Sequence, residues 1–204
     1  MSGPEAEFWD RVYAGDDYRF GSEPNAFLAE RAGAIPPGGS VLCLGDGEGR
    51  NGVWLARRGF RVTSLDQSPV AARKCAALAN RFGVELEVVI GRLPEYPLPE
   101  ASFDAVALIF LHLPPETRRA VHAIAVRALR PGGFVILEAF TPAQLGRPSG
   151  GPPTPERLQT AADLVQDFAG LELVLLEETE TELAEGDGHR GPAAVVRMLA
   201  LKPA

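Results

Sequence analysis

From residue 40 onward, short apolar runs alternate with helix-like segments, and this alternation constrains the fold more than any other feature. Strands are predicted at Val41–Leu44, Phe60–Leu65, Val84–Ile90, Phe103–Phe110 and Phe134–Phe140. Helices are predicted between them at Asn51–Arg58, Ser68–Phe82 and Pro115–Leu129. Continuous apolar runs such as A-V-A-L-I-F are typical of strands that are buried on both faces. The pattern therefore predicts a mostly parallel sheet with helices on both faces.

The end of the chain departs from this alternation. Two strand-like runs, Leu171–Leu176 and Ala193–Leu201, are joined by a polar, glycine-containing loop without a helix. A hairpin there makes the last strand antiparallel, so the predicted fold is α/β, a Rossmann-like sheet of seven strands. Residues 141–155 are rich in proline and glycine, which predicts a long loop that is functional or mobile. The loop is a candidate to close over a substrate.

The composition is that of one globular domain. The 204 residues, 46% of them hydrophobic, predict a single domain over 1–204, in which Pro36-Pro37-Gly38-Gly39 separates a helical or lid-like segment 1–39 from the core 40–204. A net charge of -7 and the lack of a basic stripe argue against nucleic acid as a partner. Without a signal sequence or an apolar run of roughly 20 residues, no membrane association is predicted and the expected location is cytoplasmic.

The two cysteines do not predict a metal site. Cys43 lies inside an apolar run and Cys75 inside a helical one, and their spacing is not that of metal ligands. Both are expected to be small buried hydrophobes, rather than catalytic thiols.

The first strand runs into a glycine-rich turn, L-G-D-G-E-G-R-N-G, which precedes a helix. Backbone N–H groups converge at such turns, which lie at the carboxyl edge of the sheet, so a nucleotide-like cofactor is expected there. Read from Gly47, the turn matches the dinucleotide pattern G-x-G-x-x-G. The strand ends at Gly45, however, and in that register the third glycine is replaced by Arg50.

The charge of the turn also bears on the cofactor. A carboxylate about 4 Å from a pyrophosphate charge repels it by roughly 1 to 4 kcal/mol, so Asp46 and Glu48 argue against a dinucleotide unless they point outwards. S-adenosylmethionine carries a sulfonium and an ammonium and no phosphate, and an acidic turn favours it.

Asp66 ends the second predicted strand, 21 positions after Gly45. A carboxylate at this place can accept hydrogen bonds from both ribose hydroxyls of a nucleoside. The alternative is that Asp66 caps the next helix, but Ser68 before Pro69 suits that role better. We therefore favour ribose binding.

Two later landmarks agree with these placements, namely F-D-A-V-A-L-I-F at the fourth strand and A-L-R-P-G-G-F-V-I-L-E at the fifth. With the glycine turn and Asp66, they resemble the class I S-adenosylmethionine-dependent methyltransferases over nearly the whole chain. The segments G-E-G-R-N and Y-R-F-G-S-E-P-N-A-F-L resemble more closely the small bacterial methyltransferases grouped with the tellurite-resistance and thiopurine enzymes. The resemblance implies S-adenosylmethionine as cofactor.

The resemblance also implies the residues of the site. The methionine part of the cofactor would be surrounded by Phe20, Gly45, Asp46, Gly47, Gly49, Arg50 and Asn51. The ribose would meet Asp66 and Gln67, the adenine Arg92 and Leu93, and the methyl-bearing side Ile109, Phe110 and His112. The tellurite branch is expected to carry a His-Arg pair directly after Glu-Leu in the terminal hairpin. Here E-L-A-E-G-D-G-H-R displaces that pair, which argues against tellurite as the substrate.

Two polar residues are candidates for the chemistry. His112 follows the fourth strand, where it is either a polar group at the reaction centre or a ring packed under the Pro114-Pro115 turn. Arg190, expected with His189 in the hairpin loop, either holds an anionic acceptor or is a solvated charge. His122 lies within a helix and is interpreted as structural.

The N-terminal segment is rich in aromatic residues. Phe8, Trp9, Val12 and Tyr13 have helical spacing and are expected to pack on the sheet. Tyr18 and Phe20 lie in a glycine-containing stretch suited to a lid, where their rings either face the sulfonium or pack in the ordinary way.

The predicted function is methyl transfer from S-adenosylmethionine to a small-molecule acceptor, possible classes being a thiol or a chalcogen oxyanion. A soft acceptor of this kind needs no general base, whereas a protonated oxygen or nitrogen acceptor does. The alternatives are an NAD(P)-dependent oxidoreductase and a non-catalytic cofactor-binding module. The fourth strand ends in L-H-L-P-P rather than N-P-P-Y or D-P-P-Y, which argues against methylation of DNA bases or protein glutamine.

Overall fold

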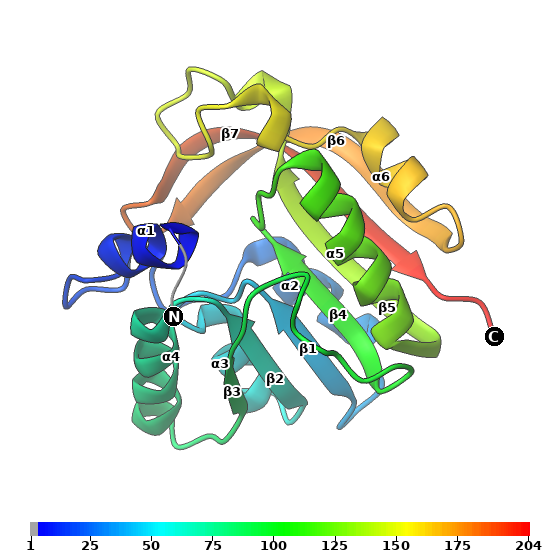
Figure 1. Cartoon of the computed structure of the whole chain (residues 1–204), viewed down its shortest axis with the longest axis horizontal. Coiled ribbons are helices and arrows are strands. Elements are labelled where there is room, and N and C mark those ends of the chain that lie inside the picture. The colour runs from blue at the N-terminus through cyan, green and yellow to red at the C-terminus, as the bar shows by residue number, and fades with distance from the viewer. Residues whose placement is uncertain (1–3) are drawn as a thin grey trace.

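The computed structural model describes residues 4–204 and contains a seven-stranded sheet in the order β3-β2-β1-β4-β5-β7-β6 (Figure 1). Neighbours among β1 to β5 pair in parallel, and β7 is antiparallel to both β5 and β6. The strands are β1 Ser40–Leu44, β2 Arg61–Asp66, β3 Glu87–Ile90, β4 Phe103–Ile109, β5 Leu129–Phe140, β6 Glu172–Glu185 and β7 His189–Leu201. The predicted fold, with its antiparallel last strand, is confirmed.

Helices cover both faces of the sheet. They are α1 Pro4–Val12, α2 Ala26–Arg31, α3 Arg50–Arg57, α4 Pro69–Phe82, α5 Pro115–Ala128 and α6 Ala161–Asp167, with 3-10 turns η1 Ala32–Ala34, η2 Pro142–Gln144 and η3 Pro155–Arg157. Successive residues of β1 point to opposite faces. Leu42 packs in the core formed with α5 and α6, whereas Val41 and Cys43 pack in the core formed with α2 and α3. This burial on both sides explains the continuous apolar runs.

Both cysteines are buried and free, as expected. No helix within residues 4–204 combines the length and the apolar character needed to cross a bilayer.

The terminal hairpin is longer than the sequence predicted. β6 and β7 pair from Glu172 with Leu201 to Glu185 with His189, and a three-residue turn of residues 186–188 joins them. His189 and Arg190 therefore open β7, and the prediction that they lie in a loop is wrong. The outer part of β6 is rich in glutamate and threonine because it is the edge of the sheet, so it lacks the apolar signal that marks a buried strand.

The loop of residues 141–155 contains no α-helix, as predicted, but it is anchored. The Gln144 side chain donates to Ser149 Oγ at 2.8 Å and accepts from the Ala194 amide at 2.9 Å. Ser149 Oγ donates in turn to the Pro192 carbonyl. These bonds fix the loop to β7 beside the carboxyl ends of β4 and β5.

The start of α4 offers a test of local stability. Ser68 Oγ accepts a hydrogen bond from the Ala71 amide at 3.0 Å and donates one to Asp10 Oδ1 at 2.5 Å, so the expected N-cap is confirmed. We expect Ser68→Ala to lower the free energy of unfolding by about 1 kcal/mol, measured by urea denaturation. Ser102→Ala, which removes only an exposed bond to the Glu100 carbonyl, should change it by less than half as much. Equal losses in the two variants would contradict the capping role.

Candidate functional site

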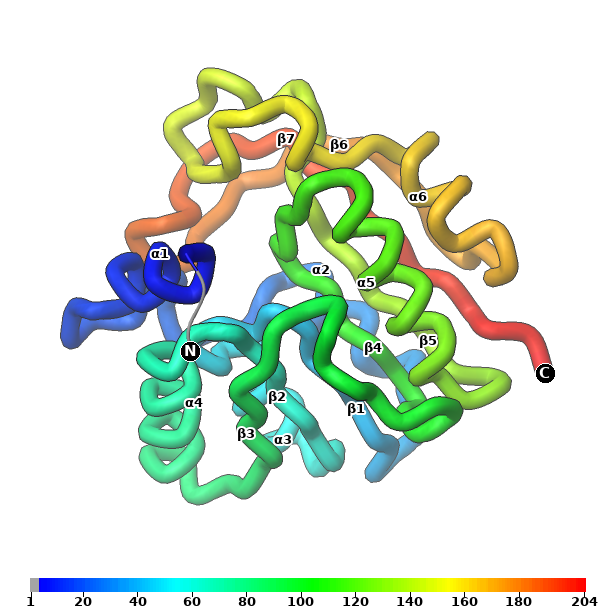
Figure 2. The backbone as a smooth tube through the Cα atoms, in the orientation of Figure 1, coloured from blue at the N-terminus to red at the C-terminus, as the bar shows by residue number. Residues whose placement is uncertain are grey.

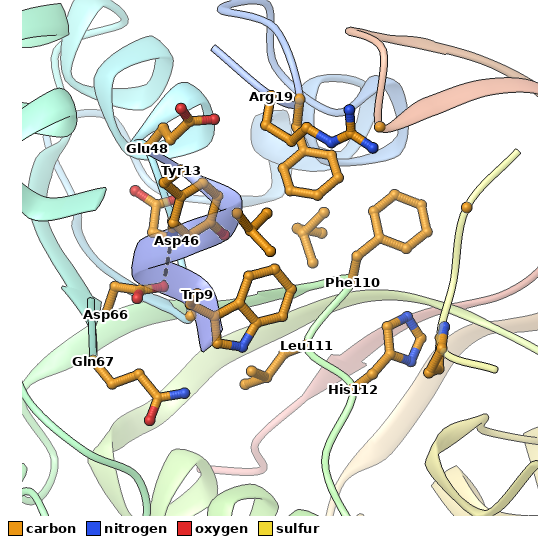
Figure 3. A pocket seen from close by; sticks show the side chains of 18 of the residues that line it. Trp9, Tyr13, Arg19, Asp46, Glu48, Asp66, Gln67, Phe110, Leu111 and His112 are labelled. Atoms are coloured by element: carbon orange, nitrogen blue, oxygen red, sulfur yellow. Dashed lines mark hydrogen bonds between the residues drawn. The ribbon is translucent and has the colours of Figure 1, made fainter. Parts of the chain in front are cut away.

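A cavity of about 690 Å³ lies at the carboxyl ends of β1, β2 and β4 (Figure 3). The residues that the sequence predicted and that line it are Phe20, Gly45, Asp46, Gly47, Arg50, Asn51, Asp66, Gln67, Leu93, Ile109, Phe110 and His112. Most of the predicted site is therefore brought together in one place.

Three predicted site residues lie outside the cavity lining. Gly49 faces α4, where an added Cβ would lie 2.3 Å from Cys75 Sγ. The side chain of Arg92 is 63% exposed beside Glu95, and that of Arg190 is 74% exposed beside Asp187. Gly49 thus allows close packing, and neither arginine is placed to touch a ligand in the cavity.

The glycine turn brings bare backbone to the cavity. Gly45 and Gly47 have φ values of 65° and 58°, in the left-handed region that favours glycine. A Cβ at Gly47 would lie 2.8 Å from Tyr13 Oη, and one at Gly45 would lie 2.7 Å from Leu111 Cδ1. The turn therefore has no room for side chains between the strands and the segments that cover them.

The two acidic residues of the turn point into the protein. Asp46 accepts hydrogen bonds from Ser64 Oγ at 2.7 Å and from the Gly52 amide at 3.2 Å, and burial raises the pKa of its carboxyl to about 7. Glu48 Oε1 lies 2.5 Å from Lys74 Nζ in a buried ion pair. Because both carboxylates are engaged within the protein, the predicted repulsion of a pyrophosphate is weaker than the sequence suggested.

Asp66 joins the end of β2 to the glycine turn. Its Oδ2 accepts from the Gly47 amide at 2.9 Å, and its Oδ1 accepts from the Ser68 amide at 2.9 Å. Burial raises the pKa of this carboxyl above its ordinary value. Both bonds orient the carboxylate on the cavity wall next to Gln67 (Figure 3).

Helix α1 forms a wall of the cavity, which the sequence did not predict. Phe8, Trp9, Val12 and Tyr13 line the cavity, and Phe8 remains 52% exposed. The prediction that this stripe packs on the sheet is wrong, because α1 lies against α4 instead. The sequence signal for this wall is the apolar stripe at helical spacing, which does not show where the helix packs.

The aromatic residues that follow α1 have separate roles. Tyr18 packs outside the cavity, where its hydroxyl donates to the Lys74 carbonyl at 3.0 Å. Phe20 lines the cavity and lies 4.5 Å from the His189 ring, centroid to centroid. The Gly188 amide donates to the Arg19 carbonyl at 3.0 Å, so this segment and the tip of the β6–β7 hairpin run side by side (Figure 2).

His112 stands at the end of the cavity remote from Asp66 (Figure 3). Its Nδ1 lies 3.1 Å from the Arg157 carbonyl, which can only accept, so the proton is on Nδ1. Its Nε2 is buried without a hydrogen-bond partner in residues 4–204. Burial lowers the pKa of His112 to about 4, and the ring is neutral at pH 7.

A buried charged cluster lies beside the cavity, and its hairpin members were missed from sequence. Glu185 Oε2 accepts from Arg50 Nη2 at 2.7 Å and lies 3.4 Å from His189 Nδ1. Asn25 Nδ2 donates to Glu185 Oε1 at 2.9 Å and also to Glu138 Oε2. His189 itself lines the cavity.

Comparisons with known proteins agree with this fold. Residues 41–133 match a family model described as a methyltransferase domain. The ubiquinone biosynthesis O-methyltransferase of Alkalilimnicola ehrlichii is 33% identical over 118 residues, which cover 56% of this chain and 46% of that protein. The chain spans about half the length of the first curated relatives it matches.

Solved structures share the fold over nearly the whole chain. A structure described by the conversion of a disulfide bond into a thioacetal group in echinomycin biosynthesis has a TM-score of 0.78 at 23% identity, covering 97% of this chain and 91% of that one. TehB of Haemophilus influenzae has a TM-score of 0.72 at 20% identity, covering 97% and 67%.

The sheet order and the matched segment support the same interpretation of the fold. The glycine turn lies within the matched segment, whereas the antiparallel last strand lies beyond it. Over residues 41–133 the chain is similar to a methyltransferase domain, and this similarity indicates S-adenosylmethionine as the cofactor.

Proposed function

We propose that the protein transfers a methyl group from S-adenosylmethionine to a small, uncharged acceptor. One observation carries the proposal, namely that a single cavity runs from Asp66 at the end of β2 to His112 beyond β4. The cofactor supplies a methyl group made electrophilic by a sulfonium. The protein supplies alignment and exclusion of water, which account for much of the rate in such displacements.

The residues of the cavity suit a phosphate-free nucleoside. Asp66 and Gln67 would hold the ribose, Leu93 would lie against the adenine, and the backbone of Gly45 and Gly47 would pass under the methionine part. The charge of Arg50 is balanced by Glu185, which accepts from Nη2 at 2.7 Å, so Arg50 adds no net positive charge for a pyrophosphate. This pairing supports S-adenosylmethionine over the NAD(P) alternative.

The acceptor end beside His112 is apolar, and Arg19 lines the cavity from the N-terminal segment. Phe110, Leu111 and Phe140 line it, and the Phe110 and Phe140 rings lie 4.6 Å apart. Arg157 pairs with Glu5 at 3.2 Å, and Arg190 lies outside. We therefore favour a neutral acceptor, such as a thiol or a hydroxyl compound, over a chalcogen oxyanion.

Calorimetry followed by turnover tests the proposal. S-adenosylhomocysteine is expected to bind, whereas NADH is not. With S-adenosylmethionine present, at least one member of a panel of thiols and phenols should be methylated, while tellurite and selenite should not. Binding of NADH alone would favour the oxidoreductase, and binding of S-adenosylhomocysteine without any turnover would favour a non-catalytic module.

We further propose that Nε2 of His112, which lacks a partner within the protein, accepts a hydrogen bond from the bound acceptor. In His112→Phe the ring still fits against Phe140, with which His112 stacks at 5.4 Å, but the acceptor nitrogen is lost. KM for the acceptor should rise about tenfold, the equivalent of one hydrogen bond, with the affinity for S-adenosylhomocysteine unchanged. Glu116→Gln, an exposed change on α5, serves as the control. An unaltered KM would show that the ring only packs.

A further inference from the structure

A second imidazole reaches the cavity from the β6–β7 hairpin. His189 opens β7 and is 7% exposed, with its ring enclosed by three aromatic side chains. Its centroid lies 4.5 Å from those of Phe20 and Phe110 and 5.2 Å from that of Phe140. Since Phe110 and Phe140 also border the acceptor end, His189 faces the space proposed for the acceptor.

Glu185 lies behind this ring. Its Oε2 is 3.4 Å from His189 Nδ1, and the same oxygen accepts from Arg50 Nη2. Asn25 holds the other oxygen. A carboxylate fixed in this way keeps the imidazole proton on Nδ1, which leaves the lone pair on Nε2 for a ligand.

His112 and His189 differ in what stabilises a positive charge. Nδ1 of His112 faces a backbone carbonyl, which carries no charge to stabilise an imidazolium, and burial lowers the pKa of this ring to about 4. Nδ1 of His189 faces a carboxylate, which stabilises the imidazolium that forms when Nε2 takes up a proton. Of the two rings, His189 is the one equipped to accept a proton.

We propose that His189, oriented by Glu185, is the general base that removes the proton of the methyl acceptor. This inference rests on the proposed function. In the step, the acceptor X–H gives its proton to Nε2 of His189, and the electron pair left on X forms the bond to the methyl carbon. The carbon–sulfur bond breaks with its pair going to sulfur, which becomes a neutral thioether, and His189 later returns the proton to solvent.

The charges around His189 determine the pH dependence. It is faced by Glu185 from β6, Arg50 from α3 and Arg19 from the N-terminal segment, and His112 lies near it after β4. Burial lowers the pKa of His189 below its ordinary value, with Arg50 and Arg19 acting in the same direction and Glu185 opposing them. The ring is therefore neutral at pH 7. We expect kcat to be constant there and to fall as the pH drops through that lowered pKa.

Kinetics with two acceptor probes test the proton transfer. Phenol is protonated at pH 7, whereas pentafluorophenol is ionised and needs no base. His189→Asn should lower kcat with phenol about 100-fold and with pentafluorophenol by less than roughly threefold. Glu185→Gln should weaken the phenol reaction and move its pH profile, and Glu185→Asp should restore part of it. Asp187→Asn, exposed in the same hairpin, is the control and should change neither reaction. Equal losses of kcat with both phenols would show that His189 has only a structural role, and would overturn the proposal.

Nitrogen-15 NMR of histidine-labelled protein, saturated with S-adenosylhomocysteine, gives a result that does not depend on turnover. His189 should be neutral at pH 7 with its proton on Nδ1, and adding phenol should shift the Nε2 resonance. A proton on Nε2 would overturn the proposal. So would an Nε2 resonance that does not shift, either at a phenol concentration at which calorimetry detects binding or at the limit of phenol solubility. If S-adenosylhomocysteine itself does not bind, the proposed function fails first, so the two failures are distinguishable.

Discussion

Replacing Asp66 by alanine should lower the affinity for S-adenosylhomocysteine about 1000-fold. The carboxylate is held by the Gly47 and Ser68 amides, and we propose that it accepts both ribose hydroxyls. A hydrogen bond to a charged group contributes about 1.5 to 3 kcal/mol, and two such bonds together account for a loss of this size. Isothermal calorimetry at pH 7 measures it.

Controls separate a lost ligand bond from a damaged turn. Thr63→Ala, on the same strand but bonded only to the exposed Glu87, should leave the affinity unchanged. Because burial raises the pKa of Asp66, the wild-type affinity should fall as the pH drops through that raised pKa, and the alanine variant should lose this dependence. A variant that unfolds at the wild-type temperature and still binds with wild-type affinity would exclude Asp66 from the ribose site.

The parallel half of the sheet could be predicted because its strands are buried on both faces. Val106 and Ala107 in β4 are apolar on consecutive positions, and both are buried. The outer half of the hairpin could not be predicted in the same way. Glu178 and Glu180 lie in β6 but face solvent, so only their pairing with β7 shows that they form a strand.

The candidate site likewise has one part that the sequence predicted and one part that it did not. The glycine turn and Asp66 are local features, and their spacing along the chain was enough to place them. Glu185 and His189 belong to the site because of contacts with distant segments, such as the bond from Asn25, which is 160 residues away in sequence. No local pattern encodes such a contact.

Charge is the property that sequence predicted least well. Asp46 and Glu48 suggested an acidic surface facing the ligand, because the sequence does not show which groups lie beneath the turn. Ser64 arrives from β2 and Lys74 from α4, and they take up the two carboxylates. The Asp46 and Glu48 carboxylates thus help to hold the turn itself in place.

Away from the cavity, a buried cluster between α5 and α6 predicts the largest stability effect. Asp167 Oδ2 accepts from Arg118 Nε at 2.8 Å and lies 2.8 Å from His122 Nδ1, and all three side chains are at most 5% exposed. Removing the carboxylate in Asp167→Ala leaves the Arg118 charge buried with only the more exposed Asp163 as partner. The free energy of unfolding should fall by about 3 kcal/mol, measured by urea denaturation at pH 7. Glu100→Ala, which breaks an exposed pair with Arg127, should cost less than about 1 kcal/mol.

The pH dependence of stability distinguishes this cluster from simple packing. Burial alone would raise the pKa of Asp167, but the hydrogen bonds from His122 and Arg118 outweigh it, and the pKa lies below its ordinary value. Its contribution is therefore present above the unfolded pKa and is lost as the pH falls through the lower folded one. Burial lowers the pKa of His122, so the unfolded state also takes up a proton first as the pH drops below about 6.5. Wild-type stability should fall on acidification for both reasons, and Asp167→Ala should lose the lower part of that dependence. Parallel curves for the two proteins would show that Asp167 acts through its volume and not through its charge.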